Sequence, residues 1–301
     1  MKRRSRLLLL IVKILVSAAL LAVIIGKAGP RDILSHLQAM DLRFFFLVSL
    51  LHILLLLFTA LRLRLLLDEE RPFWKLFSLC MIGSFFNHIL PGAIGGDAVK
   101  AYYLYQDTQK RVSSMGSVVM DRYVGFCGLL SVGLVSGFVA FGELRLAGLH
   151  WLIPSLAVFF LAGSLLLFRL RIGRRFAVVS DLYDYFSRVL KNREAVLKAY
   201  VISIVIQAIT IAMIYFTARG IGVRLPFTAL FVFVPVIITV TMIPVSISGL
   251  GVRESAFVVL FGLAGVPAGA AASISFLWYL SATVGSLTGL VEYVRYRRSS
   301  S

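Results

Sequence analysis

The chain has 301 residues, of which 59% are hydrophobic and only 15% are charged. A soluble domain is closer to half apolar and a quarter charged, so this composition excludes an ordinary soluble enzyme and indicates a protein with several membrane spans. The formal net charge of +17 stands in short runs beside apolar segments. That placement points to membrane topology and anionic lipid, and we expect no nucleic-acid partner.

The N-terminal segment predicts a first span that begins in the cytoplasm. Residues 1–6 are basic, and residues 7–25 are apolar and long enough to cross a bilayer. A cleaved signal peptide is the competing interpretation, but little polar sequence follows before the next apolar run. We therefore expect a retained helix, followed by a short interfacial helix over residues 30–40.

Residues 44–61 predict the second span. Basic residues follow it and mark the cytoplasmic side of the membrane: Arg62, Arg64, Arg71 and Lys75.

The stretch SFFNHILPGAIGGDAVKAY, residues 84–102, begins as an apolar helix and then breaks. It contains a helix-ending Pro-Gly pair, a Gly-Gly pair and two charges one helical turn apart: Pro91-Gly92, Gly95-Gly96, Asp97 and Lys100. Irregular backbone at membrane depth persists only when it is buried in protein or lines a wet cavity. The stretch therefore predicts a substrate site on a re-entrant hairpin, with a polar surface loop between two full spans as the alternative.

The rest of the chain predicts four more spans and a second broken hairpin. The spans are expected at residues 112–141, 151–168, 200–217 and 270–293, with a basic interfacial helix within 169–198. Residues 227–243 enter the membrane, and Pro244 begins the break. The segment after the break, residues 255–262, is too short to cross a bilayer.

The two halves, residues 1–148 and 149–301, resemble each other. Pro72-Phe73-Trp74-Lys75-Leu76-Phe77 recurs as Pro226-Phe227-Thr228-Ala229-Leu230-Phe231. Each half is predicted to contain, in order, a span, an interfacial helix, a span, a broken hairpin and a span. The alternative is that the few identities among common residues arose by chance. The pattern predicts an all-α polytopic membrane protein with six transmembrane helices plus two re-entrant broken-helix hairpins in an inverted-topology repeat. We expect one integral membrane domain over residues 1–301.

Charged residues near the two breaks predict an anion site. If the hairpins meet at the bilayer midplane, six charges converge: Asp97, Lys100, Asp121, Arg122, Arg253 and Glu254. Each costs roughly 2.5–3.5 kcal/mol at a helix centre, so we expect pairing or water around them. The cations suit a phosphate, and Arg122 and Arg253 are predicted to hold one phosphate together. The alternative is a structural set of ion pairs that locks the hairpins.

Catalytic motifs are not found in the sequence. It contains no P-loop, no GxSxG and no HExxH. We expect no enzymatic activity, no cofactor and no metal, although a membrane hydrolase or transferase using Asp97 with Lys100 or His88 is an open alternative. Asn87 is expected to brace the hairpin, and His88 to be a structural hydrogen-bonding group.

Three motifs carry a resemblance to a known family. FFNHILPGAIGGDAVKAYYL, VVMDRYVGF and IPVSISGLGVRE resemble the flippase-like transmembrane domain of the lysylphosphatidylglycerol synthase family. The resemblance covers nearly the whole chain. Carried over, the motif residues are Asn87, Pro91, Gly95, Gly96, Asp97, Asp121, Arg122, Gly249, Gly251, Arg253 and Glu254. Lys100 stands where we would expect the arginine of the family.

The resemblance implies a lipid translocator. In that family the domain moves aminoacylated phospholipid between leaflets, and related stand-alone proteins are linked to envelope glycolipid or polyprenyl-phosphate pathways. No aminoacyl-transfer domain is seen in this sequence, so we do not expect synthesis of lysylphosphatidylglycerol. The alternative is an accessory protein that binds a lipid-linked intermediate for a partner glycosyltransferase or lipid-modifying enzyme. We expect a multi-pass protein of the cytoplasmic membrane, with both termini cytoplasmic and anionic lipid as its ligand.

Overall fold

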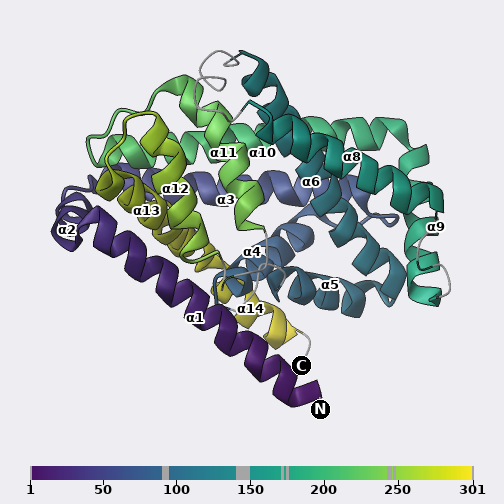
Figure 1. Cartoon of the computed structure of the whole chain (residues 1–301). Helices are drawn as coiled ribbons and strands as arrows, with labels where there is room; N and C mark the ends of the chain where they lie inside the picture. Colours follow the sequence, from purple (N-terminus) through teal and green to yellow (C-terminus); the bar gives the residue numbers. More distant parts are fainter. Residues whose placement is uncertain are drawn as a thin grey trace. The chain divides into compact units, whose positions relative to one another are not determined.

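The computed structural model is helical throughout the residues that it describes, which are 2–89, 95–139, 150–170, 173, 176–242, 246 and 249–299 (Figure 1). In chain order the helices are α1 (Lys2–Ala28), α2 (Pro30–Gln38), α3 (Leu42–Leu66), α4 (Phe73–Ile89), α5 (Gly95–Thr108), α6 (Arg111–Val139), α8 (Leu152–Leu170), α9 (Ala177–Lys191), α10 (Arg193–Gly220), α11 (Phe227–Thr241), α12 (Val252–Leu263), α13 (Ala268–Ser286) and α14 (Thr288–Ser299). The all-α expectation is confirmed for these residues.

Four helical segments of the described chain are long and apolar enough to cross a membrane: Leu42–Leu66, Arg111–Val139, Arg193–Gly220 and Ala268–Tyr296. A fifth candidate is the pair Ile14–Ala28 and Pro30–Gln38, which bend by 83° at Gly29. The protein is therefore a multi-pass membrane protein. The full count of six spans stays a prediction, because α8 contributes only a shorter apolar segment, Ile153–Leu167.

The helices recur in the same order in the two halves of the sequence. The long α3 is followed by the short α4 and α5 and then by α6, just as α10 is followed by α11, α12 and α13. In both α5 and α12 the first turn carries a carboxylate, Asp97 or Glu254, which complements the positive end of the helix dipole. The Pro91-Gly92 and Pro244 breaks lie outside the described residues, and the re-entrant, inverted arrangement stays a prediction.

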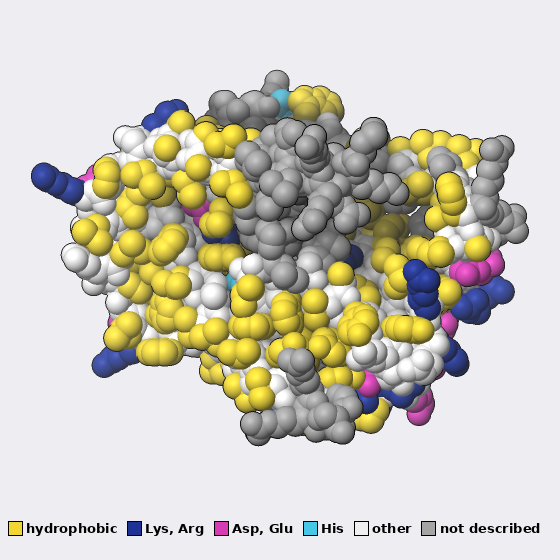
Figure 2. Space-filling view, turned by 90° about the horizontal axis from the view of Figure 1, so that it is seen from below, with side chains coloured by type: hydrophobic (Ala, Val, Ile, Leu, Met, Phe, Trp, Pro, Cys, Tyr) yellow, Lys and Arg dark blue, Asp and Glu magenta, His cyan; other side chains and the backbone are white. Residues whose placement is uncertain are grey.

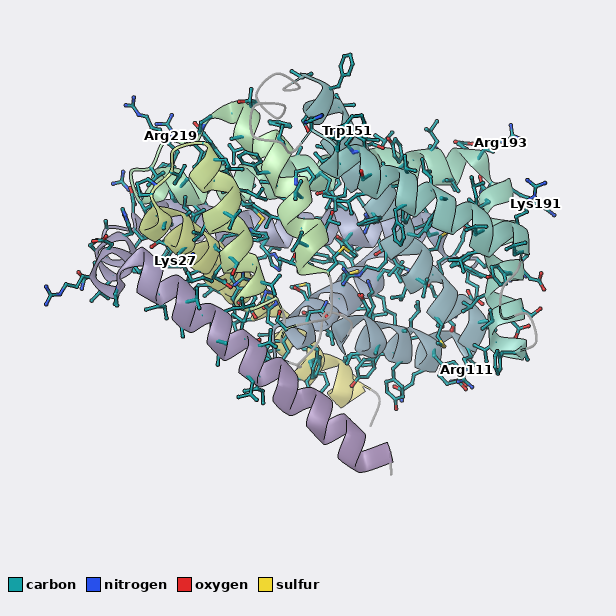
Figure 3. All side chains as sticks on the ribbon, viewed as in Figure 1. Lys27, Arg111, Trp151, Lys191, Arg193 and Arg219 are labelled. Carbon is teal, nitrogen blue, oxygen red and sulfur yellow. The ribbon has the colours of Figure 1, made fainter. Side chains whose placement is uncertain are left out.

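The described helices expose hydrophobic side chains and carry basic side chains at several of their ends. Hydrophobic side chains predominate on the face shown in Figure 2. The basic side chains labelled in Figure 3 lie at helix ends: Lys27, Arg111, Lys191, Arg193 and Arg219. Positive charges at helix ends are typical of membrane spans, where they reach the headgroup region.

Internal contacts divide the chain into two compact units. The first unit comprises Met1–Ile53, Ser84–Gly96 and Thr210–Thr288, and the second comprises Leu54–Gly83, Asp97–Ile209 and Gly289–Ser301. These boundaries differ from the expected repeat halves, because each unit takes residues from both halves of the sequence.

The first unit is built around α12 and α13, which pack against each other and against α1. Gly251, at the start of α12, has a positive φ of 82°, and a Cβ placed there would lie 2.7 Å from Leu20 Cβ on α1. Glycine is therefore required at this position for both its backbone conformation and the close approach of α1. Phe257 and Phe261 of α12 are fully buried in this unit.

The second unit is built around α6, which packs against α8 and α9. Its core contains six buried residues, Leu66, Met120, Val124, Tyr185, Val189 and Ala199. The basic amphipathic segment predicted within residues 169–198 is therefore α9, whose Tyr185 and Val189 are buried.

The loop between α3 and α4 carries an ion-paired carboxylate whose pKa is lowered. Glu69 Oε1 lies 2.7 Å from Lys110 Nζ, and its Oε2 accepts a hydrogen bond from Arg71 Nη2 at 2.9 Å. Hydrogen bonding by Lys110, and then by Arg71, holds the pKa of Glu69 below its ordinary value of 4.5. A depressed folded pKa stabilises the fold above the unfolded pKa, and this contribution is lost as pH falls through the folded pKa.

Replacing Glu69 by glutamine should therefore lower Tm at pH 7. The difference from wild type should shrink as pH falls below 4.5, the ordinary pKa, and through the lower pKa that Glu69 has in the folded protein. Thermal melts of Glu69→Gln between pH 7 and pH 3 test this, with the exposed Glu70→Gln as the matched control. A difference that is independent of pH would show that the ion pairs of Glu69 do not stabilise the fold.

Candidate functional site

Five charged side chains of the second unit form a continuous chain of ion pairs, which we call the charge cluster: Arg62, Asp121, Lys100, Asp97 and Arg122. Arg62 Nε donates to Asp121 Oδ1 at 2.7 Å. Lys100 Nζ lies 3.7 Å from Asp121 Oδ2 and 3.5 Å from Asp97 Oδ1. Arg122 Nε donates to Asp97 Oδ2 at 2.6 Å. Positive and negative groups thus alternate along the cluster.

Three helices supply the charge cluster, because residues of α3 and α5 meet Asp121 and Arg122 of α6. Arg62 belongs to α3, whereas Asp97 and Lys100 occupy the same side of α5 because they are one helical turn apart. Arg62 can approach α6 because Gly125 has no side chain, and a Cβ there would lie 2.8 Å from Arg62 Nη1. Ser203 of α10 completes the site by accepting a hydrogen bond from Arg62 Nη1 at 2.9 Å.

The charge cluster is buried at one end and open at the other. Arg62, Asp121 and Lys100 are buried, whereas the side chain of Arg122 is 46% exposed. Three cations face two carboxylates, so the described cluster carries one net positive charge. The Arg122 guanidinium uses Nε on Asp97, and its two Nη groups have no recorded partner among the described residues. Among the described residues, the accessible end of the cluster is therefore a guanidinium fork with unused donors.

In the first unit, Arg253 and Glu254 form a buried ion pair. Arg253 donates to Glu254 Oε1 through Nη2 and also through Nε, at 3.0 Å for the latter. Glu254 Oε2 accepts the Gly251 N–H at 2.7 Å and so caps α12, while Ser275 Oγ donates to Oε1 at 3.2 Å. Both charged residues are buried, and the Arg253 guanidinium lies 4.2 Å from the centre of the Tyr279 ring. This pair has the geometry of a helix cap and a structural lock.

The predicted site glycines and Asn87 have backbone roles. Gly249 has a positive φ of 77°, a conformation that side-chain-bearing residues rarely adopt, and Gly251 shares it. Asn87 Oδ1 accepts the N–H of Gly96 at 2.8 Å, so the end of α4 braces the start of α5 as expected. Gly95 and Gly96 form the first turn of α5.

The structure therefore brings four of the predicted charges together, Asp97, Lys100, Asp121 and Arg122, and pairs the other two with each other. That the two groups share one phosphate stays a prediction.

Arg62 is the member of the site that sequence reasoning missed. It was expected to flank the second span on the cytoplasmic side, but α3 continues to Leu66 and buries it. The available signal was the apolar run after it, because Leu63, Leu65 and Leu66 argue against a span that ends at Leu61.

Comparison with known proteins identifies the family of the chain. Residues 10–289 match the family described as the lysylphosphatidylglycerol synthase TM region. The chain belongs to this family. It is also 24% identical over 309 residues to a UPF0104 membrane protein of Methanothermobacter thermautotrophicus, covering 89% of this chain and 88% of that protein.

Both groups of charged residues lie within the part of the chain that matches the lysylphosphatidylglycerol synthase TM region family. The matched range contains the whole charge cluster and the Arg253–Glu254 pair. The family assignment and the helical spans together describe a multi-pass membrane protein with a role connected to membrane lipids.

Proposed function

We propose that this protein is a lipid translocator that moves an anionic or aminoacylated phospholipid, or a polyprenyl-phosphate-linked lipid, between leaflets. The supporting observation is the net positive charge of the charge cluster together with its half-exposed end at Arg122. A lipid phosphodiester carries one negative charge, so its binding would neutralise the cluster. The two unused Nη groups of Arg122 match two phosphate oxygens, because a guanidinium binds phosphate bidentately.

The buried part of the charge cluster would position this fork. Asp97 accepts a hydrogen bond from Arg122 Nε and also pairs with Lys100. Lys100 pairs with Asp121, and Asp121 pairs with Arg62. Such buried partners fix the orientation of the reactive group while its free donors face the ligand. The tails of the lipid would stay in the bilayer while the headgroup crosses through protein, without a chemical step. We place the protein in the cytoplasmic membrane, with both termini cytoplasmic.

Reconstitution in vesicles tests this function. Phosphatidylglycerol and phosphatidylcholine, each labelled on one acyl chain, are followed with a quencher that reaches only the outer leaflet. We expect the protein to accelerate exchange of phosphatidylglycerol more than that of phosphatidylcholine. Binding of phosphatidylglycerol without any protein-dependent change in leaflet accessibility would contradict translocation and favour an accessory lipid-binding role.

The variant Arg122→Lys distinguishes a phosphate fork from a structural charge. Lysine keeps the charge and the pairing with Asp97 but loses the planar pair of donors, so exchange should fall by about tenfold, the equivalent of one charge-assisted hydrogen bond. Tm should change little. The matched control is Arg64→Lys, an exposed arginine of α3.

Arg253→Lys should behave in the opposite way. Its side chain is buried and bonded to Glu254 and Ser275, so the variant should lower Tm before it affects exchange. If both lysine variants reduce exchange equally at unchanged Tm, the shared phosphate clamp is supported instead. Full exchange by Arg122→Lys would overturn the role proposed for Arg122.

A further inference from the structure

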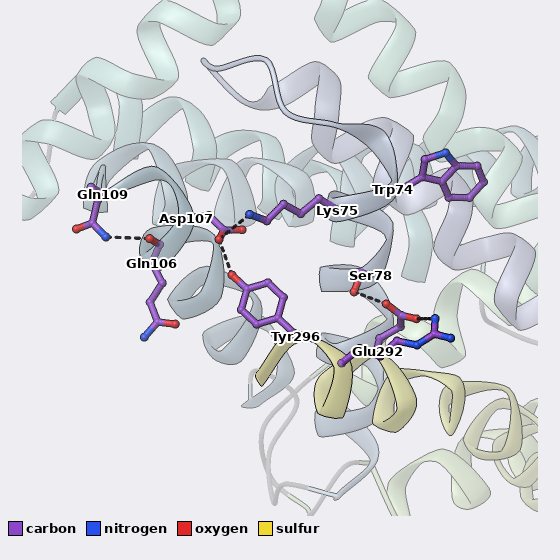
Figure 4. Close-up of a pocket in the computed structure, with 9 residues that line it drawn as sticks. Trp74, Lys75, Ser78, Gln106, Asp107, Gln109, Glu292 and Tyr296 are labelled. Carbon is purple, nitrogen blue, oxygen red and sulfur yellow. Dashed lines mark hydrogen bonds and ion pairs between the residues drawn. The ribbon is translucent and has the colours of Figure 1, made fainter. Parts of the chain in front are cut away.

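A polar cavity lies in the second unit, away from the charge cluster (Figure 4). Its volume is about 730 Å³, within the range of small-ligand sites. It is lined by residues of α4, α5 and α14 and of the turn after α5: Trp74, Lys75, Ser78, Gln106, Asp107, Gln109, Glu292, Arg295 and Tyr296. Asp107 and Asp97 are ten positions apart on α5, which corresponds to about 15 Å along the helix.

One wall of this cavity already holds an ammonium group. Lys75 Nζ lies 2.9 Å from Asp107 Oδ1 and 5.9 Å from the centre of the Tyr296 ring, and Tyr296 also donates its hydroxyl to Asp107 Oδ1 at 2.5 Å. A carboxylate beside an aromatic face is the environment that proteins use to bind alkylammonium groups. Because the Lys75 side chain is 43% exposed, its ammonium can turn away and leave this place to the ammonium of a ligand.

Asp107 has unused capacity for such a ligand. Its Oδ2 is buried and makes no hydrogen bond with the described residues. An unpaired buried carboxylate oxygen is unfavourable, and an incoming N–H donor would satisfy it. Lys75, once displaced, would pair with a negative group on the same ligand, so that the exchange conserves the number of ion pairs.

A second carboxylate and a second cation line the same cavity. Glu292 Oε2 accepts from Ser78 Oγ at 2.8 Å, and its Oε1 accepts from Arg295 Nη1 at 3.1 Å. Two carboxylates and two cations line the cavity, so the charged side chains sum to zero. A neutral but strongly polar lining is complementary to a zwitterion rather than to a ligand with net charge.

The cavity opens beside a membrane-interface residue. Trp74 is 71% exposed at the start of α4, and tryptophan is enriched at the level of lipid headgroups. On α14, which carries Glu292 and Arg295, Val291 is also exposed. These exposed apolar side chains favour a ligand with acyl chains over a water-soluble amine.

We infer that this cavity binds the headgroup of a zwitterionic phospholipid with a primary ammonium group, such as phosphatidylethanolamine. The ammonium would take the place of Lys75 Nζ between Asp107 and the Tyr296 ring. The phosphate would be bound by Lys75 and Arg295. This is a second lipid site, distinct from the phosphate site proposed at Arg122.

Native mass spectrometry of the purified full-length protein tests the inference. The protein is offered equal amounts of phosphatidylethanolamine, phosphatidylcholine and phosphatidylglycerol with the same acyl chains. We expect phosphatidylethanolamine to be retained about tenfold over both others, because only it carries an ammonium that donates N–H hydrogen bonds. Because bound lipid is the readout, the result is independent of whether the protein translocates lipid.

Variants test whether the preference for phosphatidylethanolamine arises in this cavity. Asp107→Asn should abolish it, whereas the exposed Asp184→Asn, the matched control, should not. Tyr296→Phe should retain it, because the carboxylate and the aromatic ring remain. Equal retention of phosphatidylglycerol by the wild type, or an unchanged preference in a folded Asp107→Asn variant, would overturn the inference. Retention of soluble phosphoethanolamine as tight as that of phosphatidylethanolamine would likewise overturn it, because the acyl chains would then contribute nothing.

Discussion

Replacing Arg62 by alanine should destabilise the protein by about 3–5 kcal/mol, because it removes the cation that lies closest to the buried carboxylate of Asp121. Asp121 is only 2% exposed, and after the change its nearest cation would be Lys100 Nζ, 3.7 Å from Oδ2. The hydrogen bond from Arg62 to Ser203 would be lost as well. The removed side chain would also leave a void beside Gly125.

Thermal unfolding followed by intrinsic fluorescence measures this effect, with Arg64→Ala as the control two residues away on the exposed side of α3. The control should shift Tm little, since exposed charges contribute at most about 1 kcal/mol. If Arg62→Ala has the same Tm as the control, the Arg62–Asp121 pair does not stabilise the fold. Arg62→Lys should recover part of the stability, because one ammonium does not reproduce the bonds of Arg62 to Asp121 and Ser203 together.

The second large effect is expected at Gly116, where α6 meets α9. A Cβ at this position would lie 2.5 Å from Tyr185 Cδ1, a separation that atoms do not tolerate without movement. The Tyr185 ring cannot easily yield, because it is fully buried and its hydroxyl donates to the carbonyl of Leu66. Gly116→Ala should therefore cost about 1–3 kcal/mol by overpacking, in spite of the better helix propensity of alanine.

Gly163→Ala is the matched control for this overpacking, because Gly163 lies in α8 and a Cβ there would meet nothing within 4 Å. The control should leave Tm unchanged or raise it, since glycine is the poorer helix former. The double variant Gly116→Ala with Tyr185→Leu should recover part of the loss by removing the rigid ring. A Gly116→Ala protein as stable as the control would mean that α9 moves away from α6 without cost.

Helices and interactions between residues close in the sequence were predictable from the sequence. The short helix expected at residues 30–40 forms as α2, because Pro30 suits the first turn of a helix, and its interfacial position stays a prediction. Asp97 and Lys100 pair as their helical spacing predicts. Asn87 at the end of α4 braces the start of α5 by accepting the N–H of Gly96.

Interactions between helices distant in the sequence were not predictable in the same way. Arg62 looked like a topology signal, because charge bias alone does not distinguish a flanking arginine from one at the end of a buried helix. Its partners Asp121 and Ser203 lie on α6 and α10, and no short spacing connects the three residues. The close contact of Gly116 with Tyr185 was equally unpredictable, because it depends on how α6 and α9 cross.

The single uncompensated charge of the cluster has an electrical consequence. If the protein translocates lipid as proposed, a phosphodiester bound at Arg122 would make the loaded site neutral, and its movement across the bilayer would carry no charge. The empty site carries one positive charge, and moving it across a potential of 100 mV involves about 2.3 kcal/mol. Membrane voltage would therefore act on the return of the unloaded protein and leave the lipid-carrying step unaffected. A negative-inside potential would hold the empty site facing the cytoplasm, where it is ready for the next lipid.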